Sequence, residues 1–201
     1  MRVLISGGAT REPIDAVRFV GNRSSGRLGV ALFEAAGAAG HEATLVMAAA
    51  EVAVPASAVR VETTDELLSA LTGAWPTCDV LIMAAAVADF RPVRRVAAKL
   101  RRTLGNVTLE MEPTVDVLGR LCEMKRPDQR VVGFKLEDDI ARAREKFDAL
   151  DLDLLVFNPL ATMGASGIEA TLIDRAGESS LGVMSKEAFA GVLVARACSL
   201  K

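Results

Sequence analysis

Short apolar runs of strand length alternate along this chain with longer segments in which apolar residues recur every three or four positions. The strand-length runs lie at residues 2–6, 42–48, 59–62, 79–87, 131–136 and 153–158, and the helical patterns lie near residues 27–39, 64–72, 114–125 and 138–149. A strand followed by a helix, repeated several times, predicts parallel strands joined by right-handed crossovers. We therefore expect an α/β fold with a doubly wound, Rossmann-like parallel sheet.

The C-terminal part of the chain has a different pattern. Two short strand-like runs within residues 169–183 flank Ala176 and Gly177, and a helical pattern begins at Ser185. Neighbouring short runs around such a turn are typical of a hairpin, so we expect an antiparallel extension of the sheet and not a second domain. The 201 residues form one expected domain, 1–201, long enough to bury about 70% of the surface of the unfolded chain.

Threonine residues mark the beginnings of two expected helices. Thr63 or Thr64 precedes two acidic residues, and Thr114 follows a proline. Threonine oxygens accept hydrogen bonds from the free N–H groups of a first helical turn, and acidic residues there complement the helix dipole. We expect Thr63 or Thr64 to cap the helix near 64–72 and Thr114 to cap the helix near 114–125.

Charge and hydropathy argue against several classes of partner. The formal net charge is −2 and the pI is near 5.6, whereas nucleic acids and anionic membranes bind basic surfaces. The opening MRVLISGG has a continuous run of only three apolar residues before Gly7, too few for a signal peptide, and no apolar run approaches the roughly 20 residues of a membrane span. We expect a cytoplasmic protein that binds neither nucleic acid nor a membrane.

The cysteines and the single histidine give no indication of a metal or redox site. Cys78, Cys122 and Cys198 are odd in number and form no C-x-x-C pair, which favours ordinary buried thiols over a disulfide framework or a zinc site. His41 follows a glycine at an expected helix end, where a partner of the helix dipole is favoured over a catalyst.

The stretch RFVGNRSSGRLG, residues 18–29, puts many small and polar residues at one strand-to-helix junction. Ligands of doubly wound sheets bind beyond the carboxyl ends of the strands, which is where the first strand delivers its glycines. Glycine lets a phosphate approach the backbone, serine donates hydrogen bonds, and a helix N-terminus carries partial positive charge. A structural turn with a serine cap is the alternative, but the cluster favours a phosphate site at Gly7, Gly8, Asn22, Ser24, Ser25 and Gly26.

The loop that precedes this junction, residues 9–22, is long for this architecture, which favours a functional loop. It carries four charged residues, Arg11, Glu12, Asp15 and Arg18. Arg18 either clamps a phosphate or carboxylate or forms an ion pair with Glu12 or Asp15. The residues alone favour the ion pair.

Two later segments also bring charge to the carboxyl ends of strands. In AAAVADF, residues 84–90, small alanines leave room for a flat ligand. Asp89 follows at the position where a Mg²⁺ ion that bridges phosphates would take an oxygen ligand. The alternative for Asp89 is a helix cap or a loop anchor. The basic stretch at 90–104 belongs to no expected core element, and we expect a mobile flap there. Its Lys99 is either solvated surface or a cation that neutralises a polyphosphate when the flap closes.

The stretch GFKLEDD, residues 133–139, ends another expected strand. Phe134 among aliphatic residues favours a core position, whereas Lys135 inside such a strand is harder to explain as packing. Asn158 closes the next strand, just before Pro159.

Missing signatures narrow the choice of chemistry. The chain contains no tyrosine, so it lacks the Tyr–Lys pair of short-chain dehydrogenases, and it reads GGATRE where a dinucleotide-binding strand would give G-x-G-x-x-G. No acidic residue directly follows the second strand to bind a ribose, and no P-loop is present. A nicotinamide oxidoreductase is therefore disfavoured despite the expected fold.

Read together, these motifs resemble those of the phosphopantothenate–cysteine ligase family of coenzyme A biosynthesis. The resemblance is carried by TREPIDAVRFVGNRSSGRLG, AAAVADFRP, AAKLRR, VVGFKLE and the late Asn158, and it covers nearly the whole chain. Many bacterial members are fused to a flavin-dependent decarboxylase, whereas this sequence begins at the ligase half. The resemblance thus implies no flavin in this chain and makes a separate decarboxylase an expected partner.

The resemblance implies a two-step ligation that depends on Mg²⁺. The carboxylate of 4′-phosphopantothenate attacks CTP or ATP, releases pyrophosphate and becomes an acyl nucleotide; L-cysteine then attacks the acyl carbon and releases the monophosphate. GFKLE looks more like the eukaryotic and stand-alone bacterial members than the fused bacterial ones. Because the eukaryotic branch is associated with ATP and most bacterial forms with CTP, the nucleotide stays open between the two, with CTP favoured. A homodimer is also implied, in which part of one protomer completes the neighbour's site.

The resemblance also implies roles for particular residues. Asn22 is the expected amide donor to the acyl nucleotide, Arg18 its supporting arginine, and Lys99 the flap lysine that forms or processes it. The expected nucleotide site comprises Gly7, Gly8, Ser24, Ser25, Gly26, Ala84, Asp89, Phe134 and Lys135, with Asp89 near the metal. Here Asn158 is followed by Pro159, where the family commonly has aspartate. A nucleotide-binding homologue without turnover, acting as a regulatory or interaction protein, is the alternative function.

Overall fold

The computed structural model describes residues 1–162 and 167–200, and in this part of the chain eight strands form one sheet in the order β12-β11-β10-β9-β6-β1-β4-β5. Six of them pair in parallel, and β11 and β12 add antiparallel pairs at one edge. The strands are β1 (Arg2–Gly7), β4 (Glu42–Met47), β5 (Val59–Arg60), β6 (Val80–Met83), β9 (Arg130–Leu136), β10 (Leu154–Asn158), β11 (Gly167–Asp174) and β12 (Gly177–Ser185). The doubly wound fold and its antiparallel extension are confirmed.

The direction in which the sheet grows reverses at β1. The chain first adds β4 and β5 on one side of β1, then returns to the other side with β6 and continues through β9 and β10. Such a reversal opens a crevice beyond the carboxyl ends of the two central strands. Here those strands are β1 and β6.

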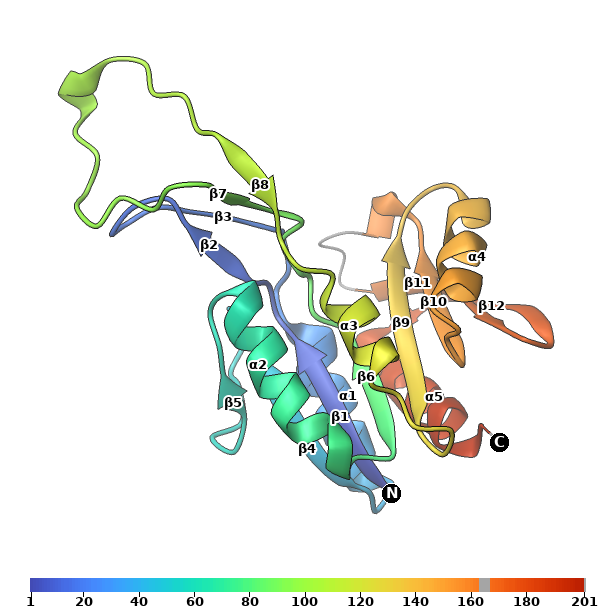
Figure 1. The fold of residues 1–201 in the computed structure, drawn as a ribbon. Coiled ribbons are helices and arrows are strands. Elements are labelled where there is room, and N and C mark those ends of the chain that lie inside the picture. The colour runs from blue at the N-terminus through green and yellow to red at the C-terminus, as the bar shows by residue number, and fades with distance from the viewer. Residues whose placement is uncertain (163–166, 201) are drawn as a thin grey trace.

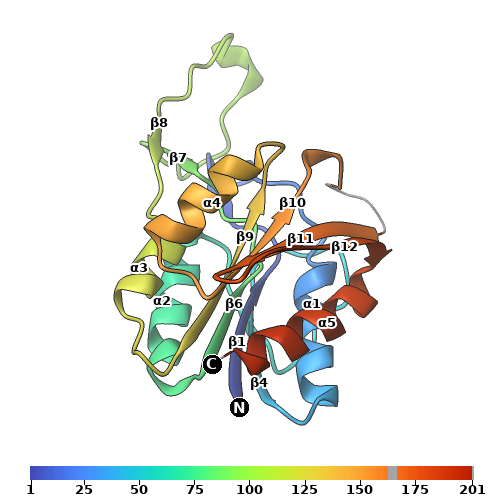
Figure 2. The ribbon, with the colours of Figure 1, turned by 90° about the vertical axis from the view of Figure 1, so that its right-hand side faces the viewer.

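Five helices of the described residues cover the two faces of the sheet. On one face α1 (Arg27–Ala38) packs beside α5 (Lys186–Ser199), and on the other lie α2 (Thr64–Ala74), α3 (Val117–Glu123) and α4 (Ile140–Ala149), as Figures 1 and 2 show. Each face has its own apolar cluster. Val3 and Ile5 of β1 belong to one cluster and Leu4 to the other, because successive side chains of a strand point to opposite faces.

Helix capping follows one prediction and departs from the other. Thr63 caps α2 in a capping box, in which its side chain accepts from the backbone N–H of Glu66 and the Glu66 carboxylate accepts from the N–H of Thr63. The prediction that Thr114 caps the next helix is wrong. That helix begins at Val117, with Asp116 as its cap: the Asp116 carboxylate accepts from the N–H of Gly119, while the Thr114 hydroxyl donates to the carbonyl of Ala88 at 2.6 Å.

Two strands are shorter than their apolar runs. The run at 59–62 forms a strand only at Val59–Arg60, and the run at 79–87 stops being a strand at Met83. After Met83 the backbone crosses toward β1, where the N–H of Ala86 donates to the carbonyl of Gly8 at 2.8 Å. The apolar residues that follow therefore line the crevice and do not extend the sheet.

Two small hairpins project from the end of the sheet where the crevice lies (Figure 1). One pairs β2 (Arg11–Pro13) with β3 (Phe19–Gly21), and the other pairs β7 (Phe90–Pro92) with β8 (Met111–Pro113). A long excursion between β7 and β8 contains the one-turn helix η2 (Arg102–Leu104). We call residues 11–21 and 90–113 the arm. Neither hairpin was predicted, and the expected flap at 90–104 lies within the second.

Two further observations concern the cysteines and the membrane. All three cysteines are free thiols; Cys78 is buried as predicted, whereas Cys122 and Cys198 are only partly buried. Burial raises the pKa of the Cys122 thiol to about 11. Within residues 1–162 and 167–200, helices fall short of the length and apolar character needed to cross a membrane.

Candidate functional site

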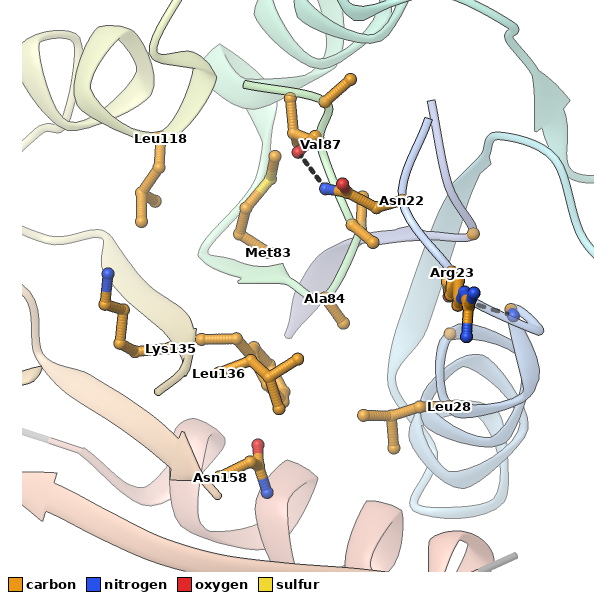
Figure 3. Close-up of a pocket in the computed structure, with 18 of the residues that line it drawn as sticks. Asn22, Arg23, Leu28, Met83, Ala84, Val87, Leu118, Lys135, Leu136 and Asn158 are labelled. Carbon is orange, nitrogen blue, oxygen red and sulfur yellow. Dashed lines mark hydrogen bonds between the residues drawn. The ribbon is translucent and has the colours of Figure 1, made fainter. Parts of the chain in front are cut away.

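A cavity of about 650 Å³ opens at the carboxyl ends of the central strands. Its walls come from the first turn of α1, the segment after β6, the start of α3, the ends of β9 and β10, and residues of α4 and α5. Figure 3 shows Arg23 and Leu28 on the α1 side and Lys135 on the β9 side, with Ala84 between them. This is the crevice that the reversal of the sheet predicts.

The glycines at the end of β1 are required by the packing of the backbone. A Cβ atom on Gly7 would lie 2.9 Å from the Cα atom of Gly29, so β1 and α1 touch through two glycines. Gly8 and Gly26 both have positive φ, and a Cβ on Gly8 would lie 2.6 Å from the carbonyl oxygen of Ala49. Gly8 and Gly26 line the cavity, while Gly7 lies behind it. The glycines alone therefore do not indicate a ligand.

The first turn of α1 gives a stronger indication of an anion site. Its N-cap residue, Gly26, makes no side-chain capping bond, and the first turn holds no acidic residue. The Ser24 hydroxyl accepts from the N–H of Gly26 at 3.3 Å and the Ser25 hydroxyl from the N–H of Arg27 at 3.4 Å, both long bonds. The N-terminus of α1 thus faces the cavity with its partial positive charge available to an anion.

Asn22 lies at the junction between the arm and this turn. Its Nδ2 donates to the carbonyl of Val87 at 2.6 Å, which connects the segment after β3 with the segment after β6 (Figure 3). Both residues line the cavity. The side-chain amide is therefore held at the rim, between the two walls that a ligand has to contact.

Small residues form the wall after β6, as the sequence predicted. The hydroxyl of buried Ser6 donates to the sulfur of Met83 and accepts from the N–H of Ala85, and so directs the chain out of the sheet. Residues 84–88 then run along the cavity with only small side chains apart from Val87. Asp89 follows, exposed and at the edge of the cavity.

The opposite wall carries two lysines, which we call the β9 cations: Lys135 of β9 and Lys146 of α4. Burial lowers the pKa of Lys146, and the nearby charge of Lys135 lowers it further. The Nζ of Lys146 lies 3.5 Å from the carbonyl oxygen of Phe134. Phe134 both packs against the core and lines the cavity, so its predicted core position and its expected ligand contact are compatible.

A second basic group lies across the cavity, and we call it the α1 cations: Arg23, Arg27 and Lys186. Lys186 is the first residue of α5, and burial together with the nearby charge of Arg27 lowers its pKa. The cavity thus has cations at both ends and small apolar residues between them. That distribution suits an elongated ligand with more than one anionic group.

Two expected catalytic residues lie outside the lining of this cavity. Arg18 and Lys99 are both in the arm, and Arg18 forms an ion pair with Asp15. The ion pair is the arrangement that the residues alone favoured. Lys99 is exposed in the segment that leads from β7 to η2.

Sequence reasoning did not identify several lining residues. Arg23 and Arg27 flank the serine–glycine turn, so their position next to that motif was a usable signal. Lys146 had a signal as well, because it follows buried Ala143 by three residues and so lies near the buried side of α4. Lys186 had none, since only the packing of α5 against α1 brings it to the cavity.

The acidic residues at the cavity suit a metal ion that is held mainly by the phosphates of a bound nucleotide. Asp89 and Asp116 line the cavity, and the described residues contain no cluster of three or more His, Cys, Asp or Glu side chains suited to a metal ion. Mg²⁺ bound with a nucleotide takes one or two protein carboxylates and fills the other positions with phosphate oxygens and water. The donor set fits that mode of binding.

The model of one protein family matches residues 1–200, almost the whole chain; its description is DNA/pantothenate metabolism flavoprotein C-terminal domain. The chain belongs to this family. The family expected from the sequence motifs is thereby confirmed.

Individual relatives agree with this family membership. The chain is 36% identical over 198 residues to a coenzyme A biosynthesis bifunctional protein CoaBC of Thermococcus kodakarensis, covering 94% of this chain and 49% of that protein. It is 41% identical over 184 residues to a cysteine/cysteine sulfinic acid decarboxylase of an unknown prokaryote, covering 87% of this chain and 51% of that protein. The chain thus spans about half the length of these curated relatives.

A solved structure of this family has the same architecture. The crystal structure of the C-terminal domain of a coenzyme A biosynthesis bifunctional protein CoaBC has 32% sequence identity to this chain and a TM-score of 0.82. The match covers 97% of this chain and 92% of that domain. The likeness therefore concerns the C-terminal half of such bifunctional proteins.

Proposed function

We propose that the protein joins 4′-phosphopantothenate to L-cysteine through an acyl nucleotide, at the expense of CTP or ATP. The observation that carries this proposal is the position of Asn22, held at the cavity rim beside the N-terminus of α1, whose N-cap residue is a glycine. The family membership supports the same reaction, since relatives bear the name of a coenzyme A biosynthesis protein. The chain covers about half of both named relatives, so neither whole-protein name is transferred, and the ligation is proposed from the site and from the match to the C-terminal domain.

In the first step, a carboxylate oxygen of the acid substrate attacks the α-phosphorus of the triphosphate, and the bond to pyrophosphate breaks. Negative charge moves toward the leaving pyrophosphate, so cations and N–H donors must already be in position. The α1 cations and the first turn of α1 fit this task. Mg²⁺, held by Asp89 and phosphate oxygens, would supply further charge neutralisation.

In the second step, the amine of cysteine attacks the acyl carbon. The new amide bond forms, the amine loses a proton, and the monophosphate leaves with the oxygen that came from the carboxylate. A neutral amide at Asn22 is suited to orient the acyl group without repelling either charged neighbour. This is the role that we assign to Asn22.

The nucleotide is assigned to the side of the cavity near β9. Ala84 leaves space for a flat base, Phe134 offers an apolar surface, and the β9 cations add positive charge. Ser24, Ser25 and Gly26 face the phosphates. We favour CTP over ATP.

Arg18 and Lys99 lie in the arm, outside the lining of the cavity. We propose that these two residues complete the site in a homodimer. The arm exposes large apolar side chains, among them Phe19, Val107 and Leu109, which a second copy would cover. Residues 1–201 then act as one folding unit in the cytoplasm, with a flavin-dependent decarboxylase as a separate partner. Lys99 would reach a cavity either by movement of the flap or from the second copy.

The test is pyrophosphate release by the purified protein with Mg²⁺, comparing CTP with ATP, in the presence and absence of 4′-phosphopantothenate and of cysteine. Release that requires the acid substrate, followed by monophosphate release that requires cysteine, is expected. The better triphosphate would identify the nucleotide.

The position of Arg18 and Lys99 outside the cavity favours a second function, nucleotide binding without turnover. Such a protein would bind CTP or ATP and release no pyrophosphate with any acid substrate. Equilibrium binding measured beside the turnover assay separates the two functions.

A further inference from the structure

Asp15 is a buried carboxylate in the turn between β2 and β3, and the reaction proposed above does not use it. Its side chain is inaccessible to solvent, although it lies in the projecting arm. Burial opposes ionisation, but hydrogen bonds from Val17, Arg18 and Leu100 outweigh it and hold the pKa of Asp15 well below its usual range. The carboxylate is therefore charged at neutral pH.

The two carboxylate oxygens of Asp15 have different partners. Oδ1 accepts from the backbone N–H groups of Val17 and Arg18, each at 2.8 Å, which is the local pattern of an Asx turn. Oδ2 accepts from the Arg18 guanidinium and, across 85 positions in the sequence, from the backbone N–H of Leu100 at 3.1 Å. One oxygen shapes the turn, and the other holds a distant segment.

Two more hydrogen bonds connect the same parts. The Arg18 guanidinium donates to the carbonyl of Leu100 at 2.8 Å, and the N–H of Val96 donates to the carbonyl of Ile14 at 3.0 Å. Residues 96–100 are thus fixed at both ends to the turn between β2 and β3. Lys99 lies inside this fixed segment.

We propose that Asp15 is a positioning residue for Lys99, acting through Arg18 and the backbone of Leu100. The role of Lys99 in the chemistry rests on the proposed function, whereas the connection to Asp15 does not. The Asp15–Arg18 pair holds residues 96–100 against the first hairpin through its hydrogen bonds to Leu100, and we call this connection the latch. The arginine therefore contributes to turnover by holding the lysine segment as well as by any contact with a ligand.

The variant Asp15→Asn separates the two oxygens. The asparagine oxygen can still accept the bonds of the Asx turn, while the NH₂ group that replaces Oδ2 faces the donors of Arg18 and Leu100 and cannot accept from them. Leu100→Pro is a second variant, which removes the N–H donor and leaves the carboxylate intact. Asp128→Asn is the matched control, because Asp128 is an exposed carboxylate that pairs with Arg126 away from the arm.

The first readout is limited proteolysis with trypsin at Arg94, Arg95, Arg101 and Arg102, which lie in the excursion. The site after Lys99 is left out of the comparison, because trypsin does not cleave the Lys–Pro bond that Leu100→Pro creates. Cleavage at the arginine sites is expected to rise about tenfold in Asp15→Asn and Leu100→Pro. Loss of a charge-assisted hydrogen bond increases the population in which the segment is detached, and the rate of cleavage follows that population. Cleavage of Asp128→Asn should equal that of the unaltered protein. Equal cleavage of all four proteins overturns the latch.

The second readout is turnover. Asp15→Asn should lower kcat with little change in the KM for the triphosphate, and it should cause no further loss in a Lys99→Ala background, because both changes remove the same contribution. Additive losses, or an unchanged kcat with faster proteolysis, overturn the positioning role. If the unaltered protein has no ligase activity, the proposed function fails, and the proteolysis result alone decides whether the latch exists.

Discussion

The cavity and the arm carry the expected site residues in two different ways. Around the cavity, Gly8 and Gly26 are required by close backbone contacts, and Ser6 and Thr114 direct the chain by hydrogen bonds. In the arm, Val17 and Phe90 are 61% and 55% exposed, and residues 96–100 are joined to the first hairpin by the hydrogen bonds at Ile14, Asp15 and Arg18. The cavity is shaped by contacts within the fold, while the arm leaves large apolar side chains exposed.

Under the proposed function, this difference places nucleotide binding and Asn22 in the cavity, and the other two expected catalytic residues in the arm. The residues expected to hold the nucleotide lie around one cavity of a single chain, apart from Gly7 behind it, whereas Arg18 and Lys99 depend on where the arm is placed. Substitutions in the cavity should therefore change nucleotide binding by a single chain, whether or not it is part of a dimer. Changes in the arm should act through assembly or through the position of the arm.

The largest effect is expected for Asn22→Ala, which removes the amide at the junction between the two regions. Turnover should fall roughly 10²- to 10³-fold, as when one donor to a reacting carbonyl is lost, while the triphosphate still binds. Steady-state kinetics with equilibrium nucleotide binding measure this. Full turnover in the variant would remove Asn22 from the site even if the protein is a ligase.

Charges placed on the exposed apolar surface of the arm should disrupt the proposed homodimer. Val107→Asp together with Leu109→Asp should raise the dimer dissociation constant by at least about 100-fold, because two buried carboxylates would lack partners. Light scattering after size-exclusion chromatography, over a range of concentrations, measures the mass. Nucleotide binding by the resulting monomer should be unchanged; if it is lost with the dimer, the cavity is not complete in one chain.

Lys146→Met tests the buried wall of the cavity. The KM for the triphosphate should rise about tenfold with kcat nearly unchanged, as expected when a contact common to ground and transition states is removed. Since burial lowers the pKa of Lys146, its charge is lost at a lower pH than that of an exposed lysine. The KM should therefore increase with pH earlier in the alkaline range in the unaltered protein than in a variant without this lysine. Parallel pH profiles would contradict the assignment.

The smallest effect is expected for Ser185→Ala, which removes the side-chain cap of α5, a helix that packs against α1, β11 and β12. The free energy of unfolding should fall by about 1 kcal/mol, measured by urea denaturation. Tryptic cleavage within residues 90–104 should stay unchanged. Faster cleavage would mean that the arm and the sheet unfold together, and the comparison between the two regions would fail.

The parts that the sequence predicted are those encoded by local patterns. The parallel sheet could be predicted because each of its buried strands is encoded by a continuous apolar run. The Thr63 cap could be predicted because a capping box spans only four residues. Thr114 was misassigned because Asp116, two residues later, forms the cap, and the Thr114 hydroxyl bonds to Ala88, a partner 26 positions away. The strands of the arm have three residues each, too short for any period to appear.

The candidate site follows the same rule. Ser24, Ser25 and Asn22 were readable because they form one continuous motif at a strand-to-helix junction. Lys186 was not, since it reaches the cavity only through the packing of α5 on α1. The link from Asp15 to Leu100 joins two segments 85 positions apart, and no local pattern in the chain predicts it.

The most direct test of an acyl nucleotide follows an oxygen atom. With 4′-phosphopantothenate labelled with ¹⁸O in its carboxylate, the monophosphate released in the presence of cysteine should carry one labelled oxygen, detected by mass spectrometry. The label transfers because the carboxylate oxygen that attacked phosphorus leaves with the monophosphate. A monophosphate without label would show that the carboxylate never bonded to the nucleotide, and the proposed ligase mechanism would be wrong.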